Sequence, residues 1–175
     1  MNLYAYVGNN PVNSVDPLGL EMALNLSISE GTMSGYDIDG GKKFSAPVST
    51  GNNKIMDVGK RGEGPIPPGL YNIYERPGGM VGFPAFVLDP VDSKPGNDKW
   101  DEGTGRGAFR SHIETDGERK GSDGCPVMAP NNQLKLADLL KRTKPGPVAT
   151  VVSPNNNRPA DIWTGPRLGT LRVIP

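Results

Sequence analysis

The run Met22-Ala23-Leu24-Asn25-Leu26-Ser27-Ile28-Ser29 indicates the class of fold, because apolar and polar residues alternate along it. In an extended chain its leucine and isoleucine side chains face one side, and its asparagine and serine side chains face the other. The run therefore predicts a β-strand with one face in the core. The 24 glycines and 18 prolines of this 175-residue chain point the same way, since they disfavour long helices and favour short strands joined by turns.

Further strands are expected along the chain on both sides of turn signals. Asp39-Gly40-Gly41-Lys42 is typical of a hairpin turn, and residues 44–50 follow it as the returning strand. Residues 64–68 are rich in glycine and proline and precede a β-prone run. The remaining predicted strands are residues 69–74, 83–88, 108–114 and 148–153.

One helix is predicted, at residues 131–142. Four leucines there include spacings of three and four residues, Asn131 or Asn132 is a candidate cap, and Pro145-Gly146 would end the helix. The four leucines of the expected buried face are Leu134, Leu136, Leu139 and Leu140. From residue 155 on the chain is loop-like, with a candidate short strand at 170–174. Together these patterns predict a mainly β domain with one or two short helices.

Charge and composition exclude several classes of function. The 19 basic and 19 acidic residues cancel, which argues against nucleic-acid binding through a basic face and, more weakly, against binding to anionic membranes. No run of 18 apolar residues is present, so no membrane span is expected. The first residues lack the basic and apolar regions of a signal peptide, so export would need another carrier.

The chain has one cysteine and one histidine, and they lie close together in sequence. His112 ends a predicted strand, and the turn Ser122-Asp123-Gly124 leads directly into Cys125. A thiol nucleophile needs a base that takes its proton and donors that stabilise an oxyanion. Histidine suits the first role near neutral pH, and backbone amides around a glycine turn suit the second. Cys125 and His112 are therefore the predicted catalytic residues, with Ser122, Asp123 and Gly124 as the oxyanion turn.

Other interpretations of the same residues remain open from the sequence. A lone cysteine is often a small buried hydrophobe, although the polar neighbours here disfavour that interpretation. A zinc site would need further histidine or cysteine ligands, so neither a metal nor a cofactor is predicted. Arg106 and Arg110 are candidates for holding a substrate carboxylate, or they are solvated charges at a strand end. His112 would be oriented by a backbone carbonyl or by a side chain such as Ser111 or Glu114.

The first twenty residues resemble the end of the core of RHS-repeat toxins. The matching runs are Asn2-Leu3-Tyr4-Ala5-Tyr6-Val7, Asn9-Asn10-Pro11 and Asp16-Pro17-Leu18-Gly19-Leu20. In that family the core cuts the chain after the Asp-Pro-x-Gly-Leu motif. The resemblance implies a cleavage motif made by Asp16, Pro17, Gly19 and Leu20, a cut before Glu21, and a division into residues 1–20 and a toxin domain 21–175. It also implies delivery by a secretion machine.

The order of His112 and Cys125 resembles the L,D-transpeptidase catalytic domain of the YkuD type. That family has a histidine upstream of a Ser/Thr-x-Gly-Cys turn. Two upstream runs, Pro47-Val48-Ser49-Thr50-Gly51 and residues 64–73, resemble family segments in the same order. The chain departs from the family at Asp123, where a second histidine is usual, and in Pro126-Val127-Met128 after the cysteine. These departures resemble the shortened motif of type VI secretion effectors.

This second resemblance implies a β-sandwich or barrel and a substrate, the tetrapeptide stem of peptidoglycan. It implies a thioacyl mechanism with L,D-carboxypeptidase or D-amino acid exchange activity, secretion by the producer and action in the periplasm of the target bacterium. An RHS core, type VI machinery and a cognate immunity protein are the implied partners. The rival hypotheses are a toxin of another chemistry, such as a nuclease, and a non-catalytic module that binds the cell wall.

Overall fold

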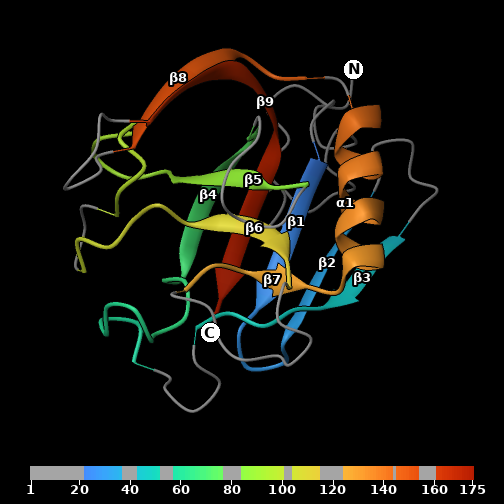
Figure 1. Ribbon diagram of the computed structural model, residues 1–175, viewed down its shortest axis with the longest axis horizontal. Coiled ribbons are helices and arrows are strands. Elements are labelled where there is room, and N and C mark those ends of the chain that lie inside the picture. Colours follow the sequence, from blue (N-terminus) through green and yellow to red (C-terminus); the bar gives the residue numbers. More distant parts are fainter. Residues whose placement is uncertain are drawn as a thin grey trace, which may run out of the picture.

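The computed structural model describes residues 22–36, 43–51, 57–76, 84–100, 104–114, 124–143, 145–153 and 161–175 (Figure 1). Within these ranges the chain forms nine strands and one helix. They are β1 (Met22–Ser27), β2 (Thr32–Tyr36), β3 (Lys43–Pro47), β4 (Gly69–Glu75), β5 (Phe86–Pro90), β6 (Arg110–Ile113), β7 (Val127–Met128), α1 (Pro130–Arg142), β8 (Val148–Ser153) and β9 (Asp161–Ile174). The predicted mainly β, barrel-like fold is confirmed.

The strands form one curled sheet whose two ends meet. Its order is β3-β2-β1-β9-β4-β5-β6-β7, with β8 paired to β9 beside this path. Ser49, just after β3, exchanges two backbone hydrogen bonds with Val127 of β7, at 2.9 and 2.8 Å. Because β3 and β7 are the opposite ends of the path, this pairing almost closes the sheet into a barrel, with Val127 at the seam.

The barrel interior is filled by apolar side chains that alternate along the strands. In β1, Met22, Leu24 and Leu26 are buried, while Ala23 and Asn25 between them are exposed, as the alternation predicts. Tyr71 of β4 is also buried there, and its hydroxyl donates to the Pro67 carbonyl at 2.7 Å. Burial raises the pKa of Tyr71, so this phenol stays a neutral donor.

A second apolar layer lies outside the barrel, under the hairpin formed by β8 and β9. Tyr74, Val87, Val151 and Trp163 pack together there, away from the main core. Figure 1 shows β8 arching beside the upper part of β9, above β4 and β5. The hairpin explains why the apolar residues of β5 are buried on both faces, since Phe86 and Leu88 line the core and Val87 meets this second cluster.

The prediction for the end of the chain is wrong in one respect, because β9 is a 14-residue strand that begins at Asp161. Its first part pairs with β8, and its second part lies between β1 and β4 in the middle of the sheet. Gly165, Pro166 and Gly169 interrupt the alternation that would have indicated a strand. Gly169 is needed where it lies, since a Cβ there would collide with the carbonyl of Met22 in β1.

The hairpin expected near residue 40 is confirmed by its two strands, which pair antiparallel with Tyr36 opposite Lys43. The strand that pairs with β3 is β2, which was not predicted, and it pairs in turn with β1. Gly35, the fourth of the five residues of β2, weakens the strand signal of that run. The turn predicted at residues 39–42 lies outside the described residues.

The helix is present at nearly the predicted bounds, but its cap and one of its faces differ. Ala129 is the N-cap without a side-chain hydrogen bond, and Pro130 begins the helix, so the predicted asparagine caps are wrong. Leu136, Leu139 and Leu140 are buried as expected, whereas Leu134 is 55% exposed. The buried stripe instead includes Gln133, which the prediction from the leucines left out.

Gln133 ties the helix to the strand that carries the histidine. Its amide nitrogen donates to the backbone carbonyls of Ser111 and Pro84, both at 3.1 Å. Its amide oxygen accepts from the Ser111 hydroxyl at 3.2 Å. A fully buried amide with both ends satisfied fixes α1 against β6 in one position.

Replacing Gln133 by leucine should destabilise the fold. The change leaves one buried carbonyl, one partly buried carbonyl and one buried hydroxyl without this partner, which costs about 2–3 kcal/mol in unfolding free energy. Urea denaturation followed by circular dichroism measures this loss. The neighbouring exposed residue supplies the control, since Leu134→Gln should stay within about 0.5 kcal/mol of wild type. Equal effects of the two substitutions would contradict the observed helix orientation.

Candidate active site

The ladder between β6 and β7 brings the predicted nucleophile and base onto adjacent backbone segments. The two strands are parallel, with His112 opposite Val127. The His112 amide donates to the carbonyl of Pro126 at 3.2 Å, and Cys125 immediately precedes that proline. The 13-residue separation in sequence is thereby reduced to neighbouring strands, which lie about 4.8 Å apart in a sheet.

The sulfur of Cys125 lies against the chain just before β6. The backbone amide of Arg110 donates to Sγ at 3.3 Å, and Sγ lies 3.9 Å from the carbonyl oxygen of Ala108. Cys125 is partly exposed, so it is not the buried core residue of the alternative interpretation. A thiol approached by an amide donor and partly open to solvent has the surroundings typical of a reactive cysteine.

The imidazole of His112 is held by the next peptide group in the chain. Nδ1 lies 2.8 Å from the Ile113 carbonyl oxygen. Because that oxygen only accepts, Nδ1 carries the proton and Nε2 carries the lone pair in the neutral ring. Burial lowers the pKa of His112, Arg76 lowers it further, and the hydrogen bond to Ile113 opposes them. The neutral imidazole, which is the form that takes a proton, is therefore favoured.

Of the orienting groups considered from the sequence, the backbone carbonyl is the one that contacts the ring. The Ser111 hydroxyl points to Gln133 instead. Oε1 of Glu114 is buried and has no hydrogen-bond partner among the described residues. Among the described residues, the contact that orients the His112 ring is therefore the Ile113 carbonyl of its own strand.

Gly124 gives the cysteine turn its shape. Its φ of +110° belongs to a backbone region that favours glycine, and a Cβ would collide with the guanidinium of Arg106. The Thr50 hydroxyl donates to the Gly124 carbonyl at 2.7 Å and accepts from the Ile66 amide at 2.9 Å. The two upstream runs singled out in the sequence therefore meet at the cysteine turn.

The guanidinium of Arg106 is buried and faces backbone oxygens. Nη1 donates to the carbonyls of Val58 and Pro65 at 2.6 and 2.7 Å, and Nη2 donates to that of Gly64 at 2.7 Å. The group also stacks over the ring of Phe109, 5.3 Å from its centroid. Through these contacts Arg106 holds residues 58–65 next to Gly124. Its suggested contact with a substrate carboxylate stays a prediction.

The side chain of Arg110 is buried too, in a pair with Asp98. The two guanidinium nitrogens donate to the two carboxylate oxygens at 2.8 and 2.5 Å. The guanidinium also lies 4.6 Å from the ring centroid of Trp163 in the outer cluster. Neither arginine is a solvated strand-end charge, and the carboxylate-binding role suggested for Arg110 likewise stays a prediction.

Several predicted features lie outside the described residues. Ser122 and Asp123 of the oxyanion turn are among them, and so is the whole cleavage motif, from Asp16 to Leu20. In the part of the chain that is described, no group of three His, Cys, Asp or Glu residues is arranged to hold a metal ion. No helix within those ranges has both the length and the apolar character needed to cross a membrane.

Three residues that support the site were missed from the sequence alone. Thr50 belongs to a run that was singled out, but nothing in that run showed that its hydroxyl reaches Gly124. Asp98 lies in a polar loop, where a buried acid gives no local signal. Gln133 is a polar residue on a leucine-rich helix, and the mismatch with the apolar stripe is the one signal that could have identified it.

A barrel domain, with a histidine on β6 and a cysteine two residues before the paired strand β7, is thus defined by its fold and site. Residues 44–151 match the model of the Tlde1 domain, and the chain belongs to the Tlde1 domain family. The family consists of antibacterial effectors that act on peptidoglycan. The match begins in β3 and ends in β8, so it includes the whole cysteine–histidine region.

Two solved structures of the helical cell shape determining protein Pgp2 from Campylobacter jejuni are similar to this chain. A point mutant of Pgp2 shares 18% identity and a TM-score of 0.48, covering 81% of this chain and 49% of the other. The second structure gives 20% and 0.49, covering 81% and 50%. The chain thus spans about half the length of these proteins. No curated protein matches the chain.

The titration of His112 provides a direct test of its surroundings. Because it is the only histidine, one imidazole signal in a proton NMR titration reports it without ambiguity. Its midpoint should lie below the usual value of 6.5, because burial disfavours the charged ring. As the unfolded chain takes up this proton at a higher pH than the folded one, stability should fall as the pH drops below 6.5. A midpoint at or above 6.5 would contradict this assignment.

Alanine at position 124 should damage the turn that presents the cysteine. A side chain there is strained at a positive φ and collides with Arg106, so Gly124→Ala should lower the unfolding free energy by at least about 2 kcal/mol. Gly165→Ala is the matched control, because a Cβ at Gly165 meets nothing within 4 Å. The control should unfold within about 0.5 kcal/mol of wild type in urea.

Proposed function

We propose that this domain is a cysteine-dependent L,D-transpeptidase or L,D-carboxypeptidase that acts on the tetrapeptide stems of peptidoglycan. The observation that carries the proposal is the arrangement around Cys125. The backbone amide of Arg110, at the start of β6, lies 3.3 Å from the sulfur. His112 follows two residues later on β6, and its Nδ1 donates to the Ile113 carbonyl. Membership of the Tlde1 domain family supports peptidoglycan as the substrate.

The first step is activation of the thiol. His112 takes the proton of Cys125 on Nε2, since Nδ1 donates to the Ile113 carbonyl. The resulting thiolate accepts a hydrogen bond from the Arg110 amide, which stabilises its charge. The Ile113 carbonyl stabilises the imidazolium that forms, so both products of the proton transfer have a fixed partner.

The thiolate then attacks the carbonyl carbon of the third stem residue, a diamino acid. Backbone amides of the turn formed by Asp123, Gly124 and Cys125 stabilise the oxyanion of the tetrahedral intermediate. The C–N bond breaks, and the imidazolium of His112 gives its proton to the departing amine of D-alanine. A thioester between Cys125 and the stem remains.

The thioester is resolved by one of two nucleophiles. Water attacks it, breaks the C–S bond and releases a shortened stem, which is L,D-carboxypeptidase action. Alternatively, the amine of a free D-amino acid attacks and replaces the terminal D-alanine. Both outcomes remove stems that cross-linking requires, which weakens the wall and accounts for toxicity.

Delivery belongs to the same proposal. The first twenty residues resemble an RHS core, which supports secretion as the C-terminal toxin of a larger protein with cleavage before Glu21. Type VI machinery and a cognate immunity protein are the partners that such a toxin requires. The domain would then act in the periplasm of the target bacterium, where its substrate is located.

Digestion of tetrapeptide-bearing muropeptides tests the chemistry. Wild-type domain should release D-alanine, Cys125→Ala should release none, and His112→Gln should lower kcat by about 10²–10⁴-fold. Mass spectrometry of the products with and without added D-methionine separates hydrolysis from exchange. D-alanine release by the Cys125→Ala variant would contradict the thioacyl mechanism.

Toxicity in a test cell separates this function from its rivals. The proposed enzyme kills when it is exported to the periplasm and not when it stays in the cytoplasm. A nuclease would kill from the cytoplasm and would be insensitive to thiol alkylation. A wall-binding module would bind sacculi and leave every muropeptide unchanged.

A further inference from the structure

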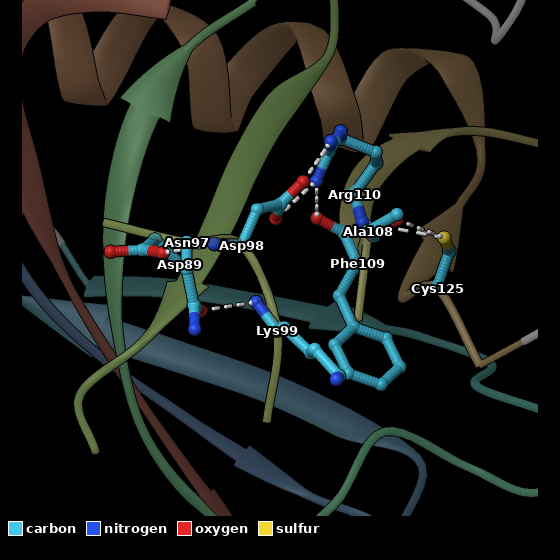
Figure 2. A network of polar contacts seen from close by, with 8 residues as sticks. All are labelled: Asp89, Asn97, Asp98, Lys99, Ala108, Phe109, Arg110 and Cys125. Atoms are coloured by element: carbon cyan, nitrogen blue, oxygen red, sulfur yellow. Dashed lines mark hydrogen bonds and ion pairs between the residues drawn. The ribbon is translucent and has the colours of Figure 1, made fainter. Parts of the chain in front are cut away.

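Two backbone groups of one short segment, residues 108–110, contact the sulfur of Cys125. The amide of Arg110 donates to Sγ, and the carbonyl of Ala108 lies on the same side of the chain (Figure 2). Neither group belongs to a side chain, so their directions depend wholly on how this segment is held. The residues that hold this segment therefore determine how its backbone amide and carbonyl are directed toward the sulfur.

Asp98 fastens the segment at two points. Its backbone carbonyl accepts from the Ala108 amide at 2.9 Å, and its carboxylate binds the Arg110 guanidinium through two hydrogen bonds. The same guanidinium donates to the Phe109 carbonyl at 2.6 Å. Figure 2 shows these contacts converging on one side of the segment, with the sulfur of Cys125 on the other.

The segment is held in a conformation that it would not adopt alone. Ala108 has a φ of +58° and Asp98 a φ of +53°, and these are the two non-glycine residues with positive φ in the described chain. Such residues persist where the surrounding structure over-determines them, and they cluster at functional sites. Here the two strained residues are joined by the hydrogen bond from the Ala108 amide to the Asp98 carbonyl, and Ala108 is the one of the two that contacts the sulfur.

A second acid fixes Asp98 in turn. The buried carboxylate of Asp89, in β5, accepts from the Asp98 amide at 3.0 Å and from the Gly96 amide at 2.9 Å. Asp98 is itself fully buried and Arg110 is only 5% exposed. A buried strand therefore holds Asp98, Asp98 holds residues 108–110, and that segment contacts the cysteine.

We propose that the buried Asp98–Arg110 pair positions the Arg110 amide so that it stabilises the thiolate of Cys125. Asp98 and the Arg110 side chain are positioning residues, while the Arg110 amide is the group that contacts the reacting sulfur. The inference rests on the proposed thiolate chemistry. It deepens that proposal by naming the source of thiolate stabilisation, and thiol titration tests it without any peptidoglycan substrate.

The pair acts through geometry and not through net charge. Its two charges cancel at short range, so it contributes little field at the sulfur. Two further charged or titratable side chains lie near the turn, Arg106 beside Gly124 and His112 of β6. A change that keeps the charge of Arg110 but loses its forked geometry therefore isolates the positioning effect.

The test measures the pKa of Cys125 in Arg110→Lys. Since the chain has one cysteine, the rate of alkylation by iodoacetamide against pH reports that thiol alone. The variant should raise the thiol pKa by at least about one unit, with about tenfold slower alkylation below the pKa. Arg167→Lys is the matched control, because Arg167 donates to Asn72 in β4 and the chemical change is identical. The control should keep the wild-type pKa.

A wild-type thiol pKa in a folded Arg110→Lys variant, as judged by near-ultraviolet circular dichroism, would overturn the proposal. If the lysine variant does not fold, the pKa of Cys125 is measured in Asp98→Asn instead. Loss of positioning raises the thiol pKa, whereas a pure charge effect lowers it, because the arginine is left uncompensated. A rise supports the proposal, and a fall or no change overturns it. A low wild-type thiol pKa without D-alanine release would instead refute the proposed function alone.

Discussion

The pairing of Val127 on both of its sides is the constraint on which the site depends. One side joins β6 in parallel, opposite His112, and the other exchanges two hydrogen bonds with Ser49. This residue closes the barrel and sets the register of the short segment that leads out of Cys125. Any slip there would separate the thiol from the strand of the histidine, because a one-residue shift turns side chains to the opposite face.

The site is built chiefly from backbone groups. The Ile113 carbonyl fixes the imidazole, the Arg110 amide meets the sulfur, and the Gly124 carbonyl is held by a threonine. Buried side chains supply the support behind these groups, through Asp98, Gln133 and the guanidinium of Arg106. Such a design keeps polar groups aligned before a substrate arrives, which is the condition for electrostatic stabilisation of a developing charge.

Local patterns predicted local structure well. The alternation in β1, the strand of β8 and the helix after Pro130 follow from periodicity and turn residues within short windows. Prediction failed where long-range packing overrides local preference. β9 contains residues that weaken a strand, yet it lies in the middle of the sheet because β1 and β4 pair with it on both sides.

The sequence by itself determined the mainly β class and the identity of the candidate nucleophile and base, since a single cysteine follows a single histidine in a glycine-rich turn. It also singled out the turn that contains Gly124 and the run that contains Thr50, without showing what the threonine does. Only the tertiary structure decided how these residues are used. The buried pair of Asp98 with Arg110 and the contact of the Arg110 amide with sulfur join residues 12 and 15 positions apart. Contacts of that kind arise from barrel closure and burial, which no local window of sequence records.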